Sequence, residues 1–200
     1  MLKRFFSRGL IEAGCDEAGR GCLAGPVVAA AVILPPKIRI LGIDDSKKLS
    51  RIQREKLEPR IRAAALDFGI GIADHLEIDD INILQASLRA MHRALDALQT
   101  TPQLILVDGN RFNPYRQIPH QTIVKGDATY LSIAAASILA KVARDRLMEK
   151  LHSEFPFYGW NQNMGYPTEI HRKAVKRYGI SPVHRKTFSI KPLLSHHRLA

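Results

Sequence analysis

The stretch Gly14–Pro26, GCDEAGRGCLAGP, decides the fold, because it ends an apolar run with two adjacent acids, Asp16 and Glu17, and then turns. The run that follows, VVAAAVIL at residues 27–34, is apolar on both faces, which is typical of a central strand. Two acids at the end of a buried strand require a partner, since burial disfavours the charged form of a carboxyl group. The glycines of the turn allow its backbone to approach another molecule closely.

Two later apolar runs also lead to acids, Asp108 and Asp127. If the three strands are neighbours, four carboxylates meet at one edge of the sheet. At an effective dielectric constant of about 20, two such charges roughly 5 Å apart repel by about 3 kcal/mol. Either one acid binds a proton or a divalent cation lies among them, and oxygen ligands favour Mg²⁺ or Mn²⁺. The later acids also have a plainer interpretation, because Asp108-Gly109 and residues 125–127 are ordinary turn sequences.

The apolar periodicity of the chain predicts an α/β fold, in which helices cover a mixed sheet and a helical C-terminal extension follows. We expect strands at residues 10–17, 27–34, 68–73, 103–110 and 121–127. We expect helices at residues 50–66, 80–98, 130–152 and 167–179. Ser50 is the expected N-cap of the first helix, and Pro59 should divide or kink it. One domain should span residues 1–200, with residues 155–200 as a basic C-terminal extension.

The charge of the chain indicates a polyanionic partner. The formal net charge is +11, and residues 141–200 alone have 12 basic and 4 acidic side chains. Nucleic acid or an anionic membrane surface would suit this charge. In a basic protein, a cluster of carboxylates indicates phosphodiester chemistry with two metal ions. Several basic side chains of the last two expected helices could follow a phosphate backbone or simply face solvent. They are Arg144, Arg146, Lys150, Arg172, Lys173, Lys176 and Arg177.

The sequence also indicates where the protein resides. The apolar run at residues 22–36 is too short to span a bilayer and is interrupted by Gly and Pro, and the N-terminal residues lack the apolar core of a signal peptide. Cys15 and Cys22 lack the spacing of a zinc site and suit a reducing compartment. We therefore expect a cytoplasmic protein.

Seven blocks of the sequence occur in the order seen in bacterial ribonuclease HII, the type 2 ribonuclease H. They are CDEAGRG, DDSKKLS, LVDGN, VKGDA, SIAAASILAKVARDRLM, GYPT and HRKTF, and they run from about Ile11 to Phe188. The resemblance implies a ribonuclease H-like fold and a metal-dependent endonuclease that uses Mg²⁺ or Mn²⁺. It implies two substrates, RNA–DNA hybrids and duplex DNA that contains single ribonucleotides. Cleavage would fall on the 5′ side of a ribonucleotide and leave 3′-hydroxyl and 5′-phosphate ends.

The same resemblance implies roles for particular residues. The catalytic carboxylates that hold two metal ions would be Asp16, Glu17, Asp108 and Asp127. The substrate contacts would be Gly19, Arg20, Gly21, Lys47 and Tyr166. A 2′-hydroxyl group marks a ribonucleotide in a duplex, and the backbone of the glycine-rich turn can reach it. Tyr166 would pack on the sugar beside the scissile phosphate, and Lys47 would contact a phosphate. This chain has Met164 where the family pattern has lysine.

Two other classes of protein share some of these features. Another ribonuclease H-like polynucleotidyl transferase, such as an integrase or a resolvase, would use the same metal ions but would leave the glycine-arginine-glycine turn and Tyr166 without a task. A non-catalytic basic RNA-binding protein would leave the acid-terminated strands unexplained. We expect a monomer that needs no obligate protein partner.

Overall fold

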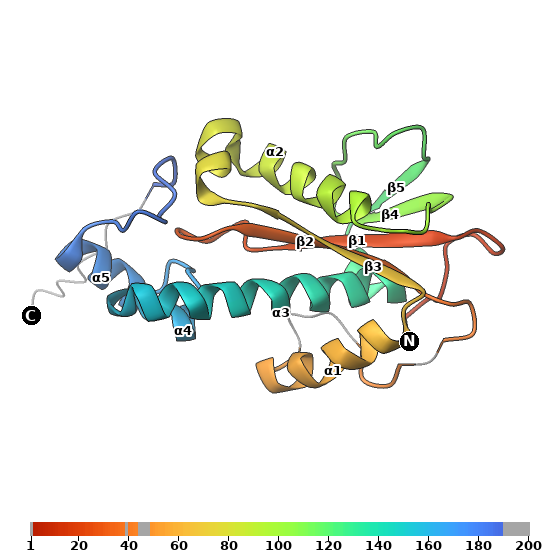
Figure 1. Ribbon diagram of the computed structural model, residues 1–200, viewed down its shortest axis with the longest axis horizontal. Coiled ribbons are helices and arrows are strands. Elements are labelled where there is room, and N and C mark those ends of the chain that lie inside the picture. Colours follow the sequence, from red (N-terminus) through yellow and green to blue (C-terminus); the bar gives the residue numbers. More distant parts are fainter. Residues whose placement is uncertain (1, 39, 44–48, 190–200) are drawn as a thin grey trace, which may run out of the picture.

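The computed structural model describes residues 2–38, 40–43 and 49–189, and a five-stranded mixed sheet forms its centre (Figure 1). The strands are β1 (Glu12–Ala18), β2 (Val27–Ile33), β3 (Asp67–Ala73), β4 (Leu104–Asp108) and β5 (His120–Ile123), in the order β3-β2-β1-β4-β5. The first three are antiparallel neighbours, whereas β4 is parallel to β1 and β5 is parallel to β4. Cys15 pairs with Val107, so the register brings Asp16 beside Asp108.

Helices cover both faces of the sheet, as Figure 1 shows. Helix α2 (His75–Asp96) packs on one face, and α3 (Leu131–Glu154) packs on the other with α1 (Arg51–Ala64) beside it. The remaining elements are short: η1 (Gly126–Ala128), η2 (Pro156–Tyr158), α4 (Trp160–Asn163) and α5 (Glu169–Tyr178). The predicted mixed sheet with helical cover is confirmed.

Alternation along β1 sends successive side chains to different cores. Ala13 and Cys15 join the apolar cluster under α2, together with Ile105 and Val107. Ala18, two positions after Asp16, belongs to the cluster under α3. Asp16 therefore faces α3, and the adjacent Glu17 faces α2.

Small residues bring both covering helices unusually close to the sheet. A Cβ atom added at Gly14 would lie 2.3 Å from the backbone carbon of Ser132 in α3. A Cβ atom added at Gly71 would lie 2.0 Å from the carbonyl oxygen of Ala90 in α2. Glycine is required at both positions because only a missing side chain permits this approach. The position of α3 along β1 is therefore fixed by backbone contact.

Several boundaries differ from those that the sequence predicts. Ser50 is the N-cap of α1 and forms a capping box with Gln53, as predicted. Pro59, however, lies inside one continuous helix and does not divide it. Helix α2 begins at His75, earlier than expected, and breaks at Asn82, where φ is 67°. Strand β5 ends at Ile123, so the prediction that Asp127 ends a strand is wrong.

The C-terminal elements pack at one end of α3 around an apolar cluster that includes Trp160 and Met148 (Figure 1). Thr168 caps α5 through its side chain, and Gly179 ends the helix. Among the residues that the structure describes, every helix is too short or too polar to span a bilayer. The division of the chain into one domain and a basic extension stays a prediction.

Candidate active site

Three aspartates form a tight carboxylate cluster. Asp16 on β1, Asp108 at the end of β4 and Asp127 on η1 each offer a carboxylate oxygen, and these atoms all lie within 4.8 Å of one another. Asp16 and Asp127 are buried, and Asp108 is half-buried. Lys125 adopts a left-handed conformation with φ of 58°, which turns the chain so that Asp127 points back to the sheet. The Gly126 amide donates a 2.7 Å hydrogen bond to Asp108 Oδ1 and fixes η1 against β4.

The cluster is electrostatically unfavourable without a counter-charge. Burial, followed by the charges of Glu17 and Asp108, raises the pKa of Asp16 well above its ordinary value. Hydrogen bonds from the Ser137 hydroxyl group and the Glu17 amide act in the opposite direction but do not compensate. Converging carboxylate oxygens in a partly buried site are the ligand set that a hard divalent cation prefers. The residues therefore fit a metal site.

Glu17 lies next to the aspartate cluster but outside it. Its carboxylate accepts a hydrogen bond of 3.2 Å from Arg20 Nη1. Glu17, Arg20 and Asp108 line a cleft of about 130 Å³ between the sheet edge and α2. A second hollow of about 430 Å³ shares Asn110 and Arg111 with this cleft. The site thus opens beside Glu17, on the α2 side of the sheet.

The glycine-arginine-glycine turn follows β1 directly. Gly19 has φ of 100°, and a Cβ atom there would lie 1.9 Å from Nε of Arg144, so the fold itself requires this glycine. A Cβ atom at Gly21 would meet nothing within 4 Å. The space in front of Gly21 is open to another molecule, whereas Gly19 is used for packing.

Tyr166 lies near this turn and is 39% exposed. Its hydroxyl group interacts with the Cys22 thiol, and Nζ of Lys141 on α3 lies 5.5 Å from its ring centroid. Its backbone amide donates to Asn163 O at 2.9 Å. Met164, two residues earlier, is buried in the C-terminal apolar cluster. The position that is lysine in the family pattern is therefore an apolar anchor in this chain.

A buried, hydrogen-bonded group of three rings, those of Trp160, His171 and His184, contacts the backbone of Tyr166. His171 Nδ1 lies 2.9 Å from the Tyr166 carbonyl oxygen and must donate to it. Its Nε2 atom accepts from Trp160 Nε1 at 3.0 Å and lies 3.1 Å from Nε2 of His184. His184 Nδ1 accepts from the Ser181 amide, so its Nε2 carries the proton. Both imidazoles are thus neutral, in agreement with burial, which lowers the pKa of His184 to about 4.

Comparison with known proteins decides the family. The family model described as Ribonuclease HII matches residues 13–191. The chain belongs to the ribonuclease HII family. Ribonuclease HII of Parabacteroides distasonis is 56% identical over 192 residues, which are 96% of either chain. Family membership decides against both an integrase-like enzyme and a non-catalytic RNA-binding protein.

Solved structures agree with the ribonuclease HII assignment. The ribonuclease H2 structure from Pyrococcus horikoshii OT3 has a TM-score of 0.75 and 32% identity, covering 90% of this chain and 94% of that chain. The PCNA:RNase HII complex from Archaeoglobus fulgidus also has a TM-score of 0.75, with 28% identity, and covers 92% of this chain and 98% of that chain. The chain is a ribonuclease H endonuclease, and it binds RNA–DNA hybrids as its family does.

The structure bears on some of the basic residues of this ribonuclease HII chain and leaves others untested. Lys47 lies outside the described residues. For Arg144 the sequence left open a phosphate contact or a side chain that faces solvent, but Arg144 is fully buried and donates only to backbone carbonyl groups, so both interpretations are wrong. Arg146 lies on the surface, where it pairs with Glu58. The sequence alone does not distinguish a helical arginine that is buried against carbonyl oxygens from one that is exposed to water.

Sequence reasoning missed the residues that support the site. Ser137 bonds Asp16, Lys141 lies over Tyr166, and Arg144 reaches the turn. All three are on α3 at three- or four-residue steps, so they share one face of the helix. The SIAAASILAKVARDRLM block contains this spacing, and the small residues around Ser137 were the available signal.

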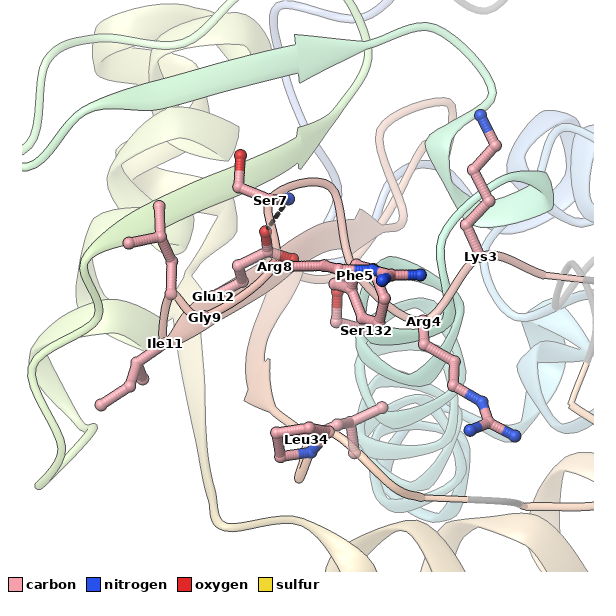
Figure 2. A pocket seen from close by; sticks show the side chains of 12 residues that line it. Lys3, Arg4, Phe5, Ser7, Arg8, Gly9, Ile11, Glu12, Leu34 and Ser132 are labelled. Carbon is pink, nitrogen blue, oxygen red and sulfur yellow. Dashed lines mark hydrogen bonds between the residues drawn. The ribbon is translucent and has the colours of Figure 1, made fainter.

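A large hollow lies away from the carboxylates (Figure 2). It has a volume of about 850 Å³ and is lined by the N-terminal segment with Glu12, Leu34 and Ser132. Glu12 accepts the amide protons of Phe6 and Ser7 and so folds this segment against the start of β1. Asp16 is four residues further along the strand, about 13 Å away. The hollow is therefore separate from the candidate active site.

Proposed function

We propose that Asp16, Asp108 and Asp127, with Glu17 beside them, hold the divalent cations of a two-metal ribonuclease. The convergence of three carboxylate oxygens within 4.8 Å is the observation that carries the proposal. When bound, such cations activate the attacking water and stabilise the departing 3′ oxygen. Either Mg²⁺ or Mn²⁺ suits an all-oxygen ligand set.

The chain's own residues would place the substrate around this cluster. Ser137 orients Asp16 through a hydrogen bond, and Lys141 lies one helical turn further, about 6 Å along α3. Lys141 Nζ lies 5.5 Å from the centroid of the Tyr166 ring, so Tyr166 lies beside the same face of α3 from which Ser137 bonds Asp16. A ribose that packs on Tyr166 would thus lie within reach of both the carboxylates and the glycine-arginine-glycine turn. The open space at Gly21 leaves room for a 2′-hydroxyl group there.

This arrangement supports cleavage on the 5′ side of a ribonucleotide, in RNA–DNA hybrids and at single ribonucleotides in duplex DNA, with 3′-hydroxyl and 5′-phosphate products. Arg20 is exposed beside Glu17, where it can meet a phosphate. We propose the same role for Lys47 from the family pattern alone. The exposed basic side chains of α5 supply further phosphate contacts.

We propose that the protein is a single-domain cytoplasmic monomer, with residues 155–200 as its basic extension. The expectation that no protein partner is obligatory stays a prediction, because the related Archaeoglobus fulgidus enzyme was solved in a complex with PCNA. Sedimentation of the purified chain, alone and with substrate duplex, measures the oligomeric state directly.

The test is cleavage of a duplex that contains one ribonucleotide, with Mg²⁺ or Mn²⁺ present. The wild-type chain should cut only at that position. Asp108→Asn should abolish cleavage while duplex binding stays equal or becomes tighter, since it removes a metal ligand and a charge that repels phosphate. Asp96→Asn, an exposed aspartate at the far end of α2, is the matched control and should keep full activity. If Asp108→Asn kept more than a few per cent of the wild-type rate, Asp108 would not belong to the metal site.

A further inference from the structure

Two buried arginines connect the glycine-rich turn to the rest of the molecule. Arg144 on α3 has no exposed surface, and Arg185, which follows α5, is 2% exposed. Burying a guanidinium group is costly unless its N–H groups find acceptors. The acceptors therefore show which part of the fold depends on each charge.

Every side-chain hydrogen bond of Arg185 in the described structure ends on a backbone carbonyl group of the turn. Nη2 donates to Gly19 O at 2.8 Å and to Pro26 O at 3.2 Å. Nη1 donates to Arg20 O and Nε donates to Gly25 O, both at 3.0 Å. One guanidinium group thus fills the inside of the turn from its first glycine to its proline.

Arg144 connects the same turn to Tyr166. Its guanidinium group donates to Ala24 O at 3.2 Å, to Pro26 O at 2.9 Å and to Met164 O at 2.8 Å. The Leu23 amide also donates to Gly165 O at 2.8 Å. The turn and the segment before Tyr166 are therefore joined by both a side chain and the backbone.

Contacts of Asp79 and Phe188 fix the position of Arg185. Asp79 on α2 accepts the amide protons of Lys186 and Thr187, at 2.9 and 3.0 Å. The ring of Phe188 lies 5.0 Å from Cζ of Arg185. Since α2 is packed on the sheet, the guanidinium group has a fixed position relative to β1.

The bonds to Gly19 O and Arg20 O have a consequence for the outer side of the turn. The N–H groups of Arg20 and Gly21 belong to the same peptide planes as these two carbonyl groups. All peptide bonds in the described structure are trans, so each N–H points away from its carbonyl oxygen and from Arg185. Neither amide donates a hydrogen bond to any group that the structure describes. A cation on the carbonyl side also polarises each peptide and strengthens its N–H as a donor.

We propose that Arg185 is a positioning residue that aims the amides of Arg20 and Gly21 at an oxygen atom of the ribonucleotide and keeps them in register with Tyr166. This inference rests on the proposed function and adds a residue that does not touch the substrate. The carbonyl group that accepts the shortest of these bonds belongs to Gly19, whose φ is 100°.

The experiment compares Arg185→Ala and Arg185→Lys with the wild type on a duplex that contains one ribonucleotide. Arg185→Ala should lower kcat on the order of a hundredfold, because a misplacement of about 1 Å has that effect. KM should change by less than about threefold, because the phosphate contacts remain. Guanidinium ion, far below denaturing concentrations, should partly restore kcat, whereas ammonium ion should not. Arg185→Lys keeps the charge but cannot reach four carbonyl groups, and it should lose most of the rate.

Arg93→Met is the matched control. Arg93 also donates to a backbone carbonyl group, Ile72 O at 2.6 Å, and it lies on the outer side of α2. It should lose stability without a change in kcat. If folded Arg185→Ala or Arg185→Lys, verified by thermal melting, kept the wild-type kcat, the proposal would be wrong. A fall in rate that only matched the unfolded fraction, without rescue by guanidinium ion, would equally overturn it. A wild-type chain that failed to cut would instead refute the proposed function.

Discussion

Replacing Asp16 by asparagine should make the metal-free protein more stable, although most substitutions of buried residues destabilise a fold. Asparagine keeps the shape of the side chain and an oxygen that can accept from Ser137 and the Glu17 amide. It removes one charge from a cluster whose oxygens lie within 4.8 Å of one another. The repulsion that it relieves is therefore the main change.

The size of the effect follows from that distance. At 4.8 Å and an effective dielectric constant of about 20, one carboxylate pair repels by about 3 kcal/mol. The raised pKa of Asp16 shows that the fold disfavours its charged form, so this repulsion is an upper bound and we expect a gain of about 2 kcal/mol. For a chain of 200 residues this corresponds to a rise in Tm of about 4–8 °C.

The assay is thermal melting in a chelator and again in excess MgCl₂. Mg²⁺ should stabilise the wild type more than Asp16→Asn, because a ligand stabilises the native state according to its affinity. Glu58→Gln is the control, since the Glu58 carboxylate is buried but accepts from Arg62 and Arg146. The same chemical change should lower Tm there, with no effect on the Mg²⁺ response. Should Asp16→Asn melt below the wild type in chelator, with an equal Mg²⁺ shift in both proteins, the three aspartates do not share one site.

Two other perturbations have defined outcomes. Burial holds the pKa of His184 at about 4, below the ordinary 6.5, so the unfolded chain binds a proton first as the pH falls. This contribution is complete above pH 6.5, is lost toward pH 4 and amounts to about 3 kcal/mol. Fluorescence of Trp160, the single tryptophan, should report the loss, and a melting temperature that stayed constant across this range would contradict the neutral imidazole pair. Tyr166→Ala should reduce kcat about a hundredfold with little change in duplex binding, whereas Tyr166→Phe should keep most of the rate. Equal losses of rate and binding in Tyr166→Ala would make the tyrosine a general contact.

The sequence predicts those parts of the molecule whose cause is local. The apolar run at residues 27–34 and the capping residue Ser50 predict their elements correctly, because strand burial and capping depend on neighbours in the chain. Helix α2 has an unexpected start, since Asn82 adopts a positive φ and joins two helical segments across a kink. Asp127 reaches the cluster from a turn rather than a strand end because Lys125 takes a left-handed conformation. Helix and strand propensities do not predict a left-handed conformation at Lys125.

In the candidate site, too, the sequence predicts some of the contacts and not others. Asp16 and Asp108 could be placed together from the expectation of neighbouring strands, and the register of β1 with β4 bears this out. The buried positions of Arg144 and Arg185 could not be predicted. These depend on contacts between distant segments, and composition alone indicates only that basic residues are abundant.

The parallel pairing of β1 with β4 has a consequence for the order of folding. Strands β1 and β2 are joined by a short turn and can associate through short-range contacts, and β3 pairs with β2 after the chain has passed through α1, whereas residue 15 must find residue 107 across the intervening chain. Contacts of such long sequence separation form late because loop closure must precede them. The aspartate cluster joins β1, β4 and η1, so it is created only by this last step. A divalent cation therefore cannot guide the early chain, and its stabilising effect acts by slowing the separation of β1 from β4 once they have met.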